Sequence, residues 1–382
     1  MQYRSFGSLD WKVSVLGFGT MRLPIVGGNQ AAINELEAVK LIRYAIDKGV
    51  NYIDSAYVYH EGNSEVVVGK ALEGKYRNKV RVATKMPVFL VQEKEDLDRI
   101  FNVQLKRLKT DHIDFYLLHS LMRSSWNKVN ELNILDWAER QIKKDKIKYL
   151  GFSFHDEFEV FKEIIDGYDK WSFCQIQFNY LDEEYQAGKA GLKYAFSRGL
   201  AVVVMEPLAG GLLAAKPPTK ILGEWNKAGM KCPPPYWGLQ WVWNHPEVAV
   251  ALSGMNSMEQ VHQNIESANH SGPNTLSQKE LKMLSLSREL FFKQGYIGCT
   301  KCHYCEHCPQ NIDIPVILAF LNEYACSKHN SVYREKIKQE YKSRVPDNRR
   351  ASNCRYCGQC EAICPQHLPI RRLLNEATKS IE

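Results

Sequence analysis

The 382-residue sequence has no uninterrupted apolar run long enough to cross a membrane. Its most apolar segment, GLAVVVMEPLAGGLLAA, is too short and contains Glu206 and Pro207. The first residues, MQYRSFGSLDWKVSVLGFG, lack the apolar stretch of a secretory signal peptide. We therefore expect a cytoplasmic protein that has no membrane partner.

The sequence also lacks a strong excess of one charge. The formal net charge is +7, and basic residues do not form a stripe interleaved with aromatics, so we expect no nucleic-acid partner. Internal repeats and low-complexity tracts are absent. With 45% hydrophobic and 24% charged residues the composition is that of an ordinary globular protein, and the length fits a large domain followed by a small one.

A GxGxxG fingerprint does not follow the first strand-like segment, VSVLGFG (13–19), so a doubly wound sheet is the less favoured alternative. Instead, short apolar segments alternate with amphipathic segments of helical periodicity over the first ~290 residues. About eight such strand–helix pairs predict an α/β protein whose parallel strands close into a (β/α)8 TIM barrel.

The character of the sequence changes near residue 270, at the turn-rich stretch HSGPN. A helix is predicted to follow, because Ser277 and Glu280 have the spacing of a capping box. Further on, IPVILAFLNEYACSK and VYREKIKQEYKSR have the composition of helices. We therefore predict a barrel over residues 1–290 and a small, mainly helical domain over residues 291–382.

Polar residues at the ends of predicted strands are the candidates for catalysis, because active sites of such barrels lie at the C-terminal ends of the strands. Asp54 ends NYID, Lys85 ends VRVATK, His119 ends DFYLLH, and Tyr59 lies in the loop after Asp54. Taken singly, each is more often a capping, surface or core residue. Their joint placement predicts a shared pocket.

These four residue types together suit proton donation to a substrate oxygen. The reference pKa of tyrosine is about 10, and a nearby ammonium lowers it because the phenolate is stabilised. An aspartate can hold the lysine in place, and a histidine can donate a hydrogen bond to a carbonyl oxygen. Such a group can protonate the alkoxide that forms when a carbonyl accepts hydride.

The sequence resembles the aldo-keto reductases over residues 1 to about 290. The matching segments are GFGTMRLP, NYIDSAYVYHEGNSEVVVGKAL, ATK, IDFYLLH, KYLGFS, QIQFNYL and MEPLAGG. The resemblance implies an oxidoreductase that reduces the carbonyl of a small molecule with NAD(P)H. It places the family's catalytic tetrad on Asp54, Tyr59, Lys85 and His119, with Tyr59 as the general acid.

The resemblance also implies a set of cofactor contacts. The residues that take these positions are Gly19, Thr20, Met21, Ser153, Gln175, Met205, Pro207, Leu208, Gly254, Ser257, Gln260 and Asn264.

Three positions depart from the family pattern. Phe154 replaces an asparagine, with His155 next to it, and Met205 replaces an aromatic residue that stacks on nicotinamide. Gln260 replaces an arginine that would bind a 2′-phosphate. Because arginine is the best partner for a phosphate, its loss favours NADH over NADPH unless another basic residue compensates. The missing aromatic residue leaves a flavin as an alternative cofactor.

Eight of the eleven cysteines form two runs of four near the C-terminal end. The second run, Cys354, Cys357, Cys360 and Cys364, is followed by proline and has the spacing of bacterial ferredoxins. The first run, Cys299, Cys302, Cys305 and Cys308, is one residue shorter before its last cysteine. These spacings predict two [4Fe-4S] clusters, each bound by three cysteines of one run and the last cysteine of the other.

Zinc is the alternative for these eight thiols. Neither run consists of two separated CxxC pairs, so iron–sulfur is favoured. Residues 299–382 contain 13 Lys and Arg against 9 Asp and Glu, and this excess would offset negatively charged clusters. His303, His307 and His367 are expected beside the clusters or at the surface. The isolated Cys174, Cys232 and Cys326 are expected to be inert core thiols.

The two predicted halves use different electron chemistry, since nicotinamide transfers two electrons as hydride and a cubane transfers one at a time. One hypothesis is a carbonyl reductase whose clusters are structural or regulatory. The alternative is a flavin-assisted reductase in which the clusters exchange electrons with the barrel site, with a redox partner protein. A barrel without enzymatic activity is the third hypothesis, and the complete tetrad argues against it.

Overall fold

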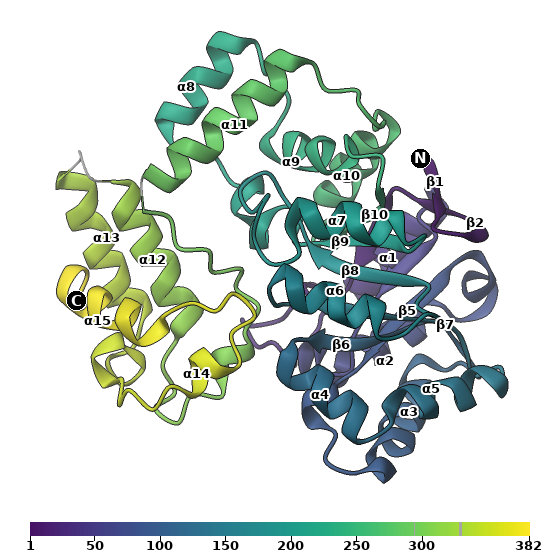
Figure 1. The fold of residues 1–382 in the computed structure, drawn as a ribbon. Coiled ribbons are helices and arrows are strands. Elements are labelled where there is room, and N and C mark those ends of the chain that lie inside the picture. The colour runs from purple at the N-terminus through teal and green to yellow at the C-terminus, as the bar shows by residue number, and fades with distance from the viewer. Residues whose placement is uncertain (294, 328–330) are drawn as a thin grey trace. The chain divides into compact units, whose positions relative to one another are not determined.

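The computed structural model describes residues 1–293, 295–327 and 331–382. These residues form two compact units, which are drawn together in Figure 1. The first unit comprises Met1–Pro207 and Pro235–Leu276, and the second comprises Leu208–Pro234 and Ser277–Glu382. The second unit therefore includes a segment from within the first 290 residues. The predicted domain boundary between residues 290 and 291 stays a prediction.

The first unit is built on a closed barrel of eight parallel strands, which confirms the predicted barrel. The order around the barrel is β10-β3-β4-β5-β6-β7-β8-β9. Consecutive strands are neighbours because each crossover helix returns the chain to the next parallel position. The strands are β3 (Leu16–Gly19), β4 (Tyr52–Asp54), β5 (Arg81–Met86), β6 (Ile113–Leu121), β7 (Ile147–Phe154), β8 (Phe173–Gln177), β9 (Ala201–Met205) and β10 (Val248–Gly254).

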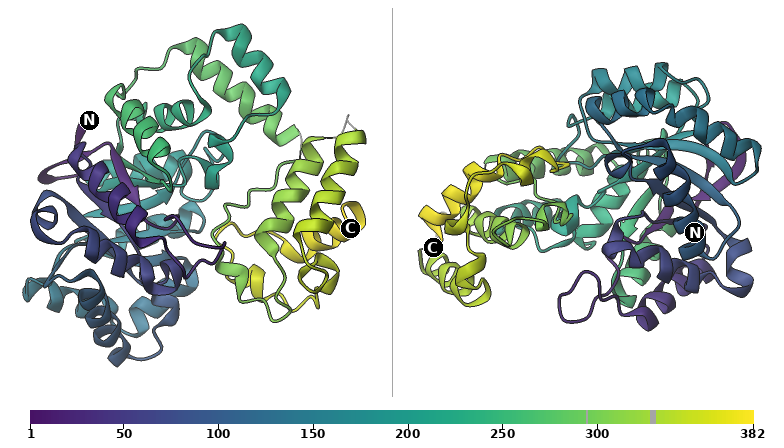
Figure 2. Two further views of the ribbon diagram at one scale, coloured as in Figure 1. Left: turned by 180° about the vertical axis from the view of Figure 1, so that it is seen from behind. Right: turned by 90° about the horizontal axis from the view of Figure 1, so that it is seen from below.

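Amphipathic helices surround this barrel (Figure 2). In α1 the buried residues Ala38, Leu41, Ile42 and Ala45 recur at helical spacing, and the Asn34 side chain caps the first turn. Among the described residues, none of the helices combines the length and the apolar character that a membrane span requires. The helices are α1 (Glu35–Asp47), α2 (Asn63–Ala71), α3 (Lys94–Leu108), α4 (Arg123–Glu131), α5 (Ile134–Lys143), α6 (Phe158–Asp166), α7 (Gly188–Ser197), α9 (Pro234–Trp243) and α10 (Met258–Asn269).

A hairpin of β1 (Tyr3–Phe6) and β2 (Leu9–Ser14) precedes the barrel. Its fully buried Phe6 packs its ring against Tyr52, Phe115 and Phe173, with a ring-centroid distance of 4.6 Å to Phe115. These three aromatic residues lie near the N-terminal ends of their strands. The hairpin therefore closes that end of the barrel, and the opposite end, where the strands finish, is left for the site.

The second unit is helical around a separate apolar core. Helix α12 packs against α13 and α15, and Ile317, Leu321 and Tyr341 belong to the buried cluster (Figure 2). Helix α8 packs against α11, where the buried Trp225 Nε1 donates to Ser287 Oγ at 2.8 Å. The α-helices are α8 (Thr219–Ala228), α11 (Gln278–Lys293), α12 (Ile314–Cys326), α13 (Ser331–Arg344), α14 (Gln359–Ala362) and α15 (Ile370–Ser380).

The three isolated cysteines differ in their surroundings. Cys174 is buried in β8, as predicted for a core thiol. The prediction for Cys232 was wrong, because this residue is exposed in the turn before α9. The side chain of Cys326 is outside the described part of the chain.

Candidate active site and cysteine cavities

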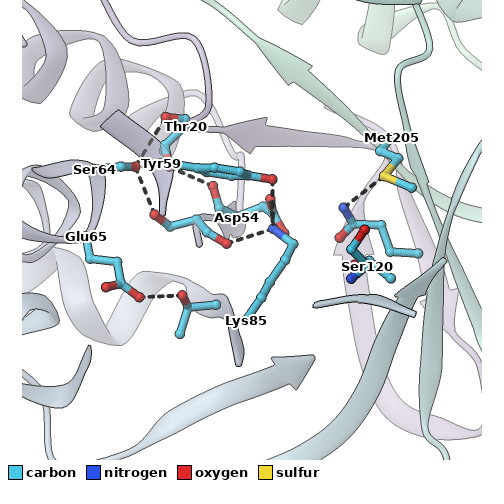
Figure 3. Close-up of polar contacts among 12 residues, drawn as sticks. Thr20, Asp54, Tyr59, Ser64, Glu65, Lys85, Ser120 and Met205 are labelled. Carbon is cyan, nitrogen blue, oxygen red and sulfur yellow. Dashed lines mark hydrogen bonds and ion pairs between the residues drawn. The ribbon is translucent and has the colours of Figure 1, made fainter. Parts of the chain in front are cut away.

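The structure brings Asp54, Tyr59 and Lys85 together at the C-terminal end of the barrel (Figure 3). Lys85 Nζ donates to Asp54 Oδ1 at 2.7 Å and to the Tyr59 hydroxyl at 3.4 Å. It also donates to the Ser55 carbonyl oxygen at 2.7 Å. The His119 ring lies edge-on to the Tyr59 ring with a centroid distance of 6.0 Å. All four residues of the predicted tetrad therefore line one site.

Burial governs the charges of this group. It lowers the pKa of Lys85, and the adjacent Asp54 carboxylate opposes that shift. It raises the pKa of Asp54, which the Lys85 ammonium opposes. It also lowers the pKa of His119 well below its usual range, with further lowering from Lys85 and His155. His119 is therefore neutral near pH 7, and a neutral imidazole can still donate one hydrogen bond to a carbonyl oxygen.

A second buried network lies behind Lys85 (Figure 3). The fully buried Glu65 carboxylate accepts from Thr84 Oγ1 at 2.6 Å and from Gln104 Nε2 at 2.8 Å, and it pairs with Arg107 at 3.2 Å. Gln104 Nε2 also donates to the Lys85 carbonyl oxygen at 3.0 Å. This network fixes the backbone from which Lys85 extends. Sequence analysis missed it, although GNSEVVVG shows an acidic residue in an apolar helix.

Tyr59 begins a short turn of helix, η1 (Tyr59–Gly62), in which the backbone takes an unusual course. His60 and Glu61 have φ angles of 52° and 56°, a left-handed conformation that costs about 1–2 kcal/mol per residue for L-amino acids. The His60 ring accepts from the Leu23 amide at 3.1 Å, and its Nδ1 lies 2.7 Å from the Gln30 carbonyl oxygen. These contacts tie the Tyr59 turn to the loop after β3.

The predicted cofactor residues near β3 lie around the end of that strand. Gly19 pairs with Asp54 on one side and with Gly254 on the other. Thr20 Oγ1 donates to the Asp54 carbonyl oxygen at 2.9 Å and contacts Ser64 Oγ at 2.7 Å (Figure 3). Met21, the next residue, is half-buried.

The predicted carboxamide contacts lie on β7, β8 and β9. Ser153 Oγ accepts from the Ser120 amide at 2.8 Å. Gln175 Nε2 lies 3.5 Å from Met205 Sδ (Figure 3). The other amide atom, Gln175 Oε1, is buried and accepts no hydrogen bond from the described residues. Phe154, where the family pattern has asparagine, is fully buried in the core.

The remaining predicted contacts follow β9 and β10. Ser257 caps α10 and accepts from the Gln260 amide at 3.3 Å, and Asn264 Nδ2 donates to Ser253 Oγ at 3.0 Å. The Gln260 side chain turns back and accepts from the Asn256 amide at 2.9 Å. Pro207 ends the first unit, whereas Leu208 belongs to the second unit and stays a prediction.

The barrel and this strand-end site agree with a known family. A model of the aldo/keto reductase family matches residues 15–285, well over half of the chain. The chain belongs to the aldo/keto reductase family. It is therefore an oxidoreductase enzyme of this family, and the resemblance inferred from the motifs is confirmed for the barrel. The matched region ends before the first cysteine run.

Relatives and solved structures of similar sequence support this assignment. The uncharacterized oxidoreductase YrpG of Bacillus subtilis is 30% identical over 237 residues, 56% of this chain and 69% of that protein. The holo form of aldo-keto reductase AKR11C1 from Bacillus halodurans has a TM-score of 0.61 and 26% identity, covering 75% of this chain and 96% of that one. An aldo/keto reductase from Klebsiella pneumoniae in complex with NADP and acetate has a TM-score of 0.58 and 26% identity. This match covers 74% of this chain and 93% of that one.

The second unit of this aldo/keto reductase carries two cavities lined by the cysteine runs. The larger, of about 180 Å³, is lined by Cys308 together with Cys354, Cys357 and Cys360. The smaller, of about 20 Å³, is lined by Cys299, Cys302, Cys305 and Cys364. Cys305 also borders the larger cavity. The smaller cavity therefore has three cysteines of the first run and the last of the second, and the larger has three cysteines of the second run with Cys305 and Cys308 of the first.

The cysteines that line the two cavities differ in how buried they are and in which neighbours raise the pKa of their thiols. Burial raises the pKa of the Cys305 thiol, and the neighbouring Cys302, Cys299 and Cys364 raise it further. Burial raises the pKa of Cys360 to about 11, with contributions from Glu361, Cys308 and Cys354. Cys357, on the larger cavity, is exposed. Among the described residues, no three His, Cys, Asp or Glu side chains are grouped so as to hold a single metal ion.

Proposed function

We propose that the enzyme reduces the carbonyl of a small molecule with a nicotinamide dinucleotide, using Tyr59 as the general acid. The observation that carries the proposal is the placement of Lys85 Nζ 2.7 Å from Asp54 and 3.4 Å from the Tyr59 hydroxyl, beside His119. A lysine held there stabilises the phenolate that remains after the tyrosine has given up its proton. Asp54 keeps the buried lysine charged.

Two features support a dinucleotide at this site. Gln175 Oε1 is a buried acceptor without a donor among the described residues, and the amide N–H of a carboxamide is a suitable donor. Ser153 and Gln175 pair with each other across the adjacent strands β7 and β8, as two contacts to one carboxamide would need. The Klebsiella pneumoniae structure described above is a complex with NADP and acetate, whereas Gln260 in this chain favours NADH. Both dinucleotides belong in the assay.

The chain's own residues would have distinct tasks in the reduction. The bound nicotinamide supplies hydride to the carbonyl carbon. Neutral His119 donates a hydrogen bond to the carbonyl oxygen and orients it toward Tyr59. The Tyr59 hydroxyl then transfers its proton to that oxygen as negative charge develops. Lys85 and Asp54 stay charged throughout and stabilise the phenolate until it is reprotonated.

The test is dinucleotide oxidation by a panel of aldehydes and ketones, assayed without oxygen. We expect Tyr59→Phe to lower kcat by about 10²- to 10⁴-fold, the usual effect of a general acid, while the dissociation constant of the dinucleotide stays unchanged. Tyr57→Phe is the matched control, because Tyr57 is in the same loop and packs its ring on Arg107 at 4.5 Å. Equal activity of the two variants would contradict the proposal.

We also propose that the eight clustered cysteines bind two [4Fe-4S] clusters. The proposed ligands of one are Cys299, Cys302, Cys305 and Cys364, and those of the other are Cys308, Cys354, Cys357 and Cys360. The exchange of the last cysteine between runs is the arrangement of two-cluster ferredoxins, and the lining of the two cavities supports it. The clusters would supply one-electron transfer.

Metal analysis of protein purified without oxygen tests this second proposal. We expect about eight iron atoms per chain, from two four-iron clusters. About two zinc atoms per chain and no iron would show that the cavities hold zinc instead.

An alternative function is a flavin-assisted reductase in which the clusters exchange electrons with the barrel site. The observation that favours it is Met205, which takes the place of an aromatic residue that would stack on nicotinamide. Denaturing the anaerobically purified enzyme and identifying the released molecules by mass spectrometry separates the two functions. About one flavin per chain would favour the alternative, and a nicotinamide dinucleotide would favour the first proposal.

A further inference from the structure

The turn that carries Tyr59 is held on both sides by one arginine of α3. Arg107 Nη1 donates to the Tyr57 carbonyl oxygen at 3.1 Å, and the guanidinium group lies over the Tyr57 ring at 4.5 Å. On the other side of Tyr59, a Cβ atom at Gly62 would lie 2.5 Å from Arg107 Nη2. The guanidinium group therefore packs against this glycine, and Arg107 contacts the chain before and after Tyr59.

The backbone of this turn has a conformation that needs support. His60, Glu61 and Gly62 have φ angles of 52°, 56° and 93°, so left-handed residues follow one another directly after Tyr59. The Cβ atom of an L-amino acid disfavours this conformation at His60 and Glu61. A strained backbone persists only where surrounding contacts fix it. The hydrogen bond and the packing from Arg107 are contacts of that kind.

Arg107 is itself fixed by a buried carboxylate. The same Nη1 atom that binds the Tyr57 carbonyl oxygen donates to Glu65 Oε2 at 3.2 Å. The side chain of Glu65 is 0% exposed and that of Arg107 is 23% exposed. Helices α2 and α3, which carry the two residues, pack closely at Gly69, where a Cβ atom would collide with the Arg107 carbonyl oxygen. The two helices therefore hold the ion pair in one geometry.

Glu65 also binds the strand that carries Lys85. Its Oε1 accepts from Thr84 Oγ1 at 2.6 Å and from Gln104 Nε2 at 2.8 Å (Figure 3). The Gln104 amide in turn donates to the Lys85 carbonyl oxygen at 3.0 Å. All of these side chains are buried. The carboxylate is therefore bound to the part of β5 from which Lys85 extends.

We propose that Glu65 and Arg107 are positioning residues that set the 3.4 Å separation between Lys85 Nζ and the Tyr59 hydroxyl. One oxygen of the Glu65 carboxylate is bound to the strand of Lys85, and the other is bound, through Arg107, to the turn of Tyr59. Neither residue supplies a proton to the substrate. The inference rests on the proposed role of Tyr59 as general acid and adds the residues that hold this acid beside its lysine.

The experiment measures kcat for carbonyl reduction and the dissociation constant of the dinucleotide, with the complete protein purified without oxygen. Arg107→Met should lower kcat by about 10²-fold, the cost of displacing a catalytic group by about 1 Å, and should leave the dissociation constant unchanged. Arg107→Lys should recover most of the loss, because a single nitrogen atom makes both hydrogen bonds in the wild type. A lysine variant as slow as the methionine variant would contradict the inference.

A second background tests whether Arg107 acts through Tyr59. In Tyr59→Phe the general acid is absent, so the position of that side chain no longer limits the reaction. Adding Arg107→Met to Tyr59→Phe should therefore lower kcat by at most about twofold, because residues that act as a unit are not additive. A general loss of stability would lower kcat in both backgrounds alike.

Arg77→Met is the matched control. Arg77 pairs with Asp114 at 2.8 Å, and the side-chain exposures of 20% and 12% resemble those of the Arg107 pair. Arg77 precedes β5 and Asp114 lies near the start of β6, at the opposite end of the barrel from the tetrad. This variant loses a comparable ion pair and should leave kcat unchanged.

Glu65→Gln is a second variant, which serves if Arg107→Met does not fold. The glutamine keeps the size of the side chain and an acceptor oxygen for Thr84 and Gln104. Its amide nitrogen takes the place of the oxygen that accepts from Arg107, so the ion pair is lost. We expect kcat to fall as in Arg107→Met, with the dissociation constant of the dinucleotide again unchanged.

Other results would overturn the inference. An undiminished loss in the Tyr59→Phe background would make Arg107 a purely structural residue. An equal loss in Arg77→Met would make the effect common to half-buried ion pairs. Full activity in Tyr59→Phe, or none in the wild type, would overturn the proposed function together with this inference. Unchanged kcat in Arg107→Met and Glu65→Gln, with low activity in Tyr59→Phe, would overturn the inference alone.

Discussion

The tetrad and the cysteine cavities differ in how much of each site the chain's own hydrogen bonds complete. In the barrel, Lys85 Nζ already has three oxygen atoms of the protein within 3.4 Å. In the second unit, burial raises the pKa of the Cys305 and Cys364 thiols, and the proposed clusters would take the place of these protons. The first site is therefore organised by hydrogen bonds within the chain, whereas the second would be completed by the proposed clusters.

The largest expected effect is the loss of iron from the second unit when one of the proposed cluster ligands is removed. Cys308→Ser and Cys364→Ser should each lower iron from about eight to about four atoms per chain. The exposed Cys357 borders the larger cavity, so the cluster there should lose iron to a chelator first. Cys308→Ser should therefore abolish the fast phase of iron loss, and Cys364→Ser should keep it. The opposite assignment of phases would show that each run binds its own cluster.

A large effect is also expected when the buried ion pair of the tetrad is broken. Lys85→Met leaves the Asp54 carboxylate buried without its counter-ion and should lower the free energy of unfolding by about 3–5 kcal/mol. Urea unfolding followed by tryptophan fluorescence measures this loss. The double variant Asp54→Asn with Lys85→Met should recover most of the stability but none of the activity. A double variant as unstable as Lys85→Met would contradict the pairing.

A smaller effect is expected from the segment that connects β9 to α8. Gly210 has a φ angle of 66°, and a Cβ atom there would lie 2.4 Å from the Thr300 carbonyl oxygen, beside Cys299. Gly210→Ala should destabilise the second unit by about 2–4 kcal/mol through backbone strain and overpacking, and it should lower the iron content. Gly211→Ala is the control, because its φ of 96° gives strain but nothing lies within 4 Å of the new atom. Equal iron content in both variants would rule out the contact as the cause.

The smallest expected effect is on the pH dependence of the free energy of unfolding, through His119 in the barrel. Because burial lowers the pKa of His119 well below 6.5, the unfolded chain binds a proton that the folded chain does not bind below pH 6.5. Stability should therefore decrease as pH falls below 6.5, by at most about 1.4 kcal/mol per pH unit from this residue. His119→Asn should remove that part of the slope in urea unfolding at pH 7.5 and pH 5.5. An unchanged slope would mean that His119 is protonated in the folded enzyme.

Much of the fold and of the candidate site could be predicted from sequence. The alternation of strands and helices predicted the closed barrel, and residues at strand ends meet because parallel strands finish at one edge. Cysteine spacing predicted two groups of cluster ligands, and this assignment stays a prediction. Both patterns can be read from a single sequence. Periodicity indicates where strands and helices lie, and the position of a residue at the end of a strand indicates which end of the barrel it is on.

Features that depend on tertiary contacts could not be predicted. Arg22 and Glu206 are 184 positions apart and form their ion pair only when β3 and β9 finish on either side of β10. The left-handed turn at His60 depends on ring contacts with the loop after β3. The exposure of Cys232 and the grouping of Leu208–Pro234 with the C-terminal part also depend on packing between distant segments.

The segment Leu208–Pro234 has a consequence for how the two units could be separated. It belongs to the second unit but lies in sequence between β9 and α9 of the barrel, so three peptide connections, 207–208, 234–235 and 276–277, join the units. A stop codon before the cysteine runs would remove most of the second unit but leave Leu208–Pro234 and α11 attached to the barrel. No single cut point therefore divides the chain into the two units, and separating them would take a cut at all three connections.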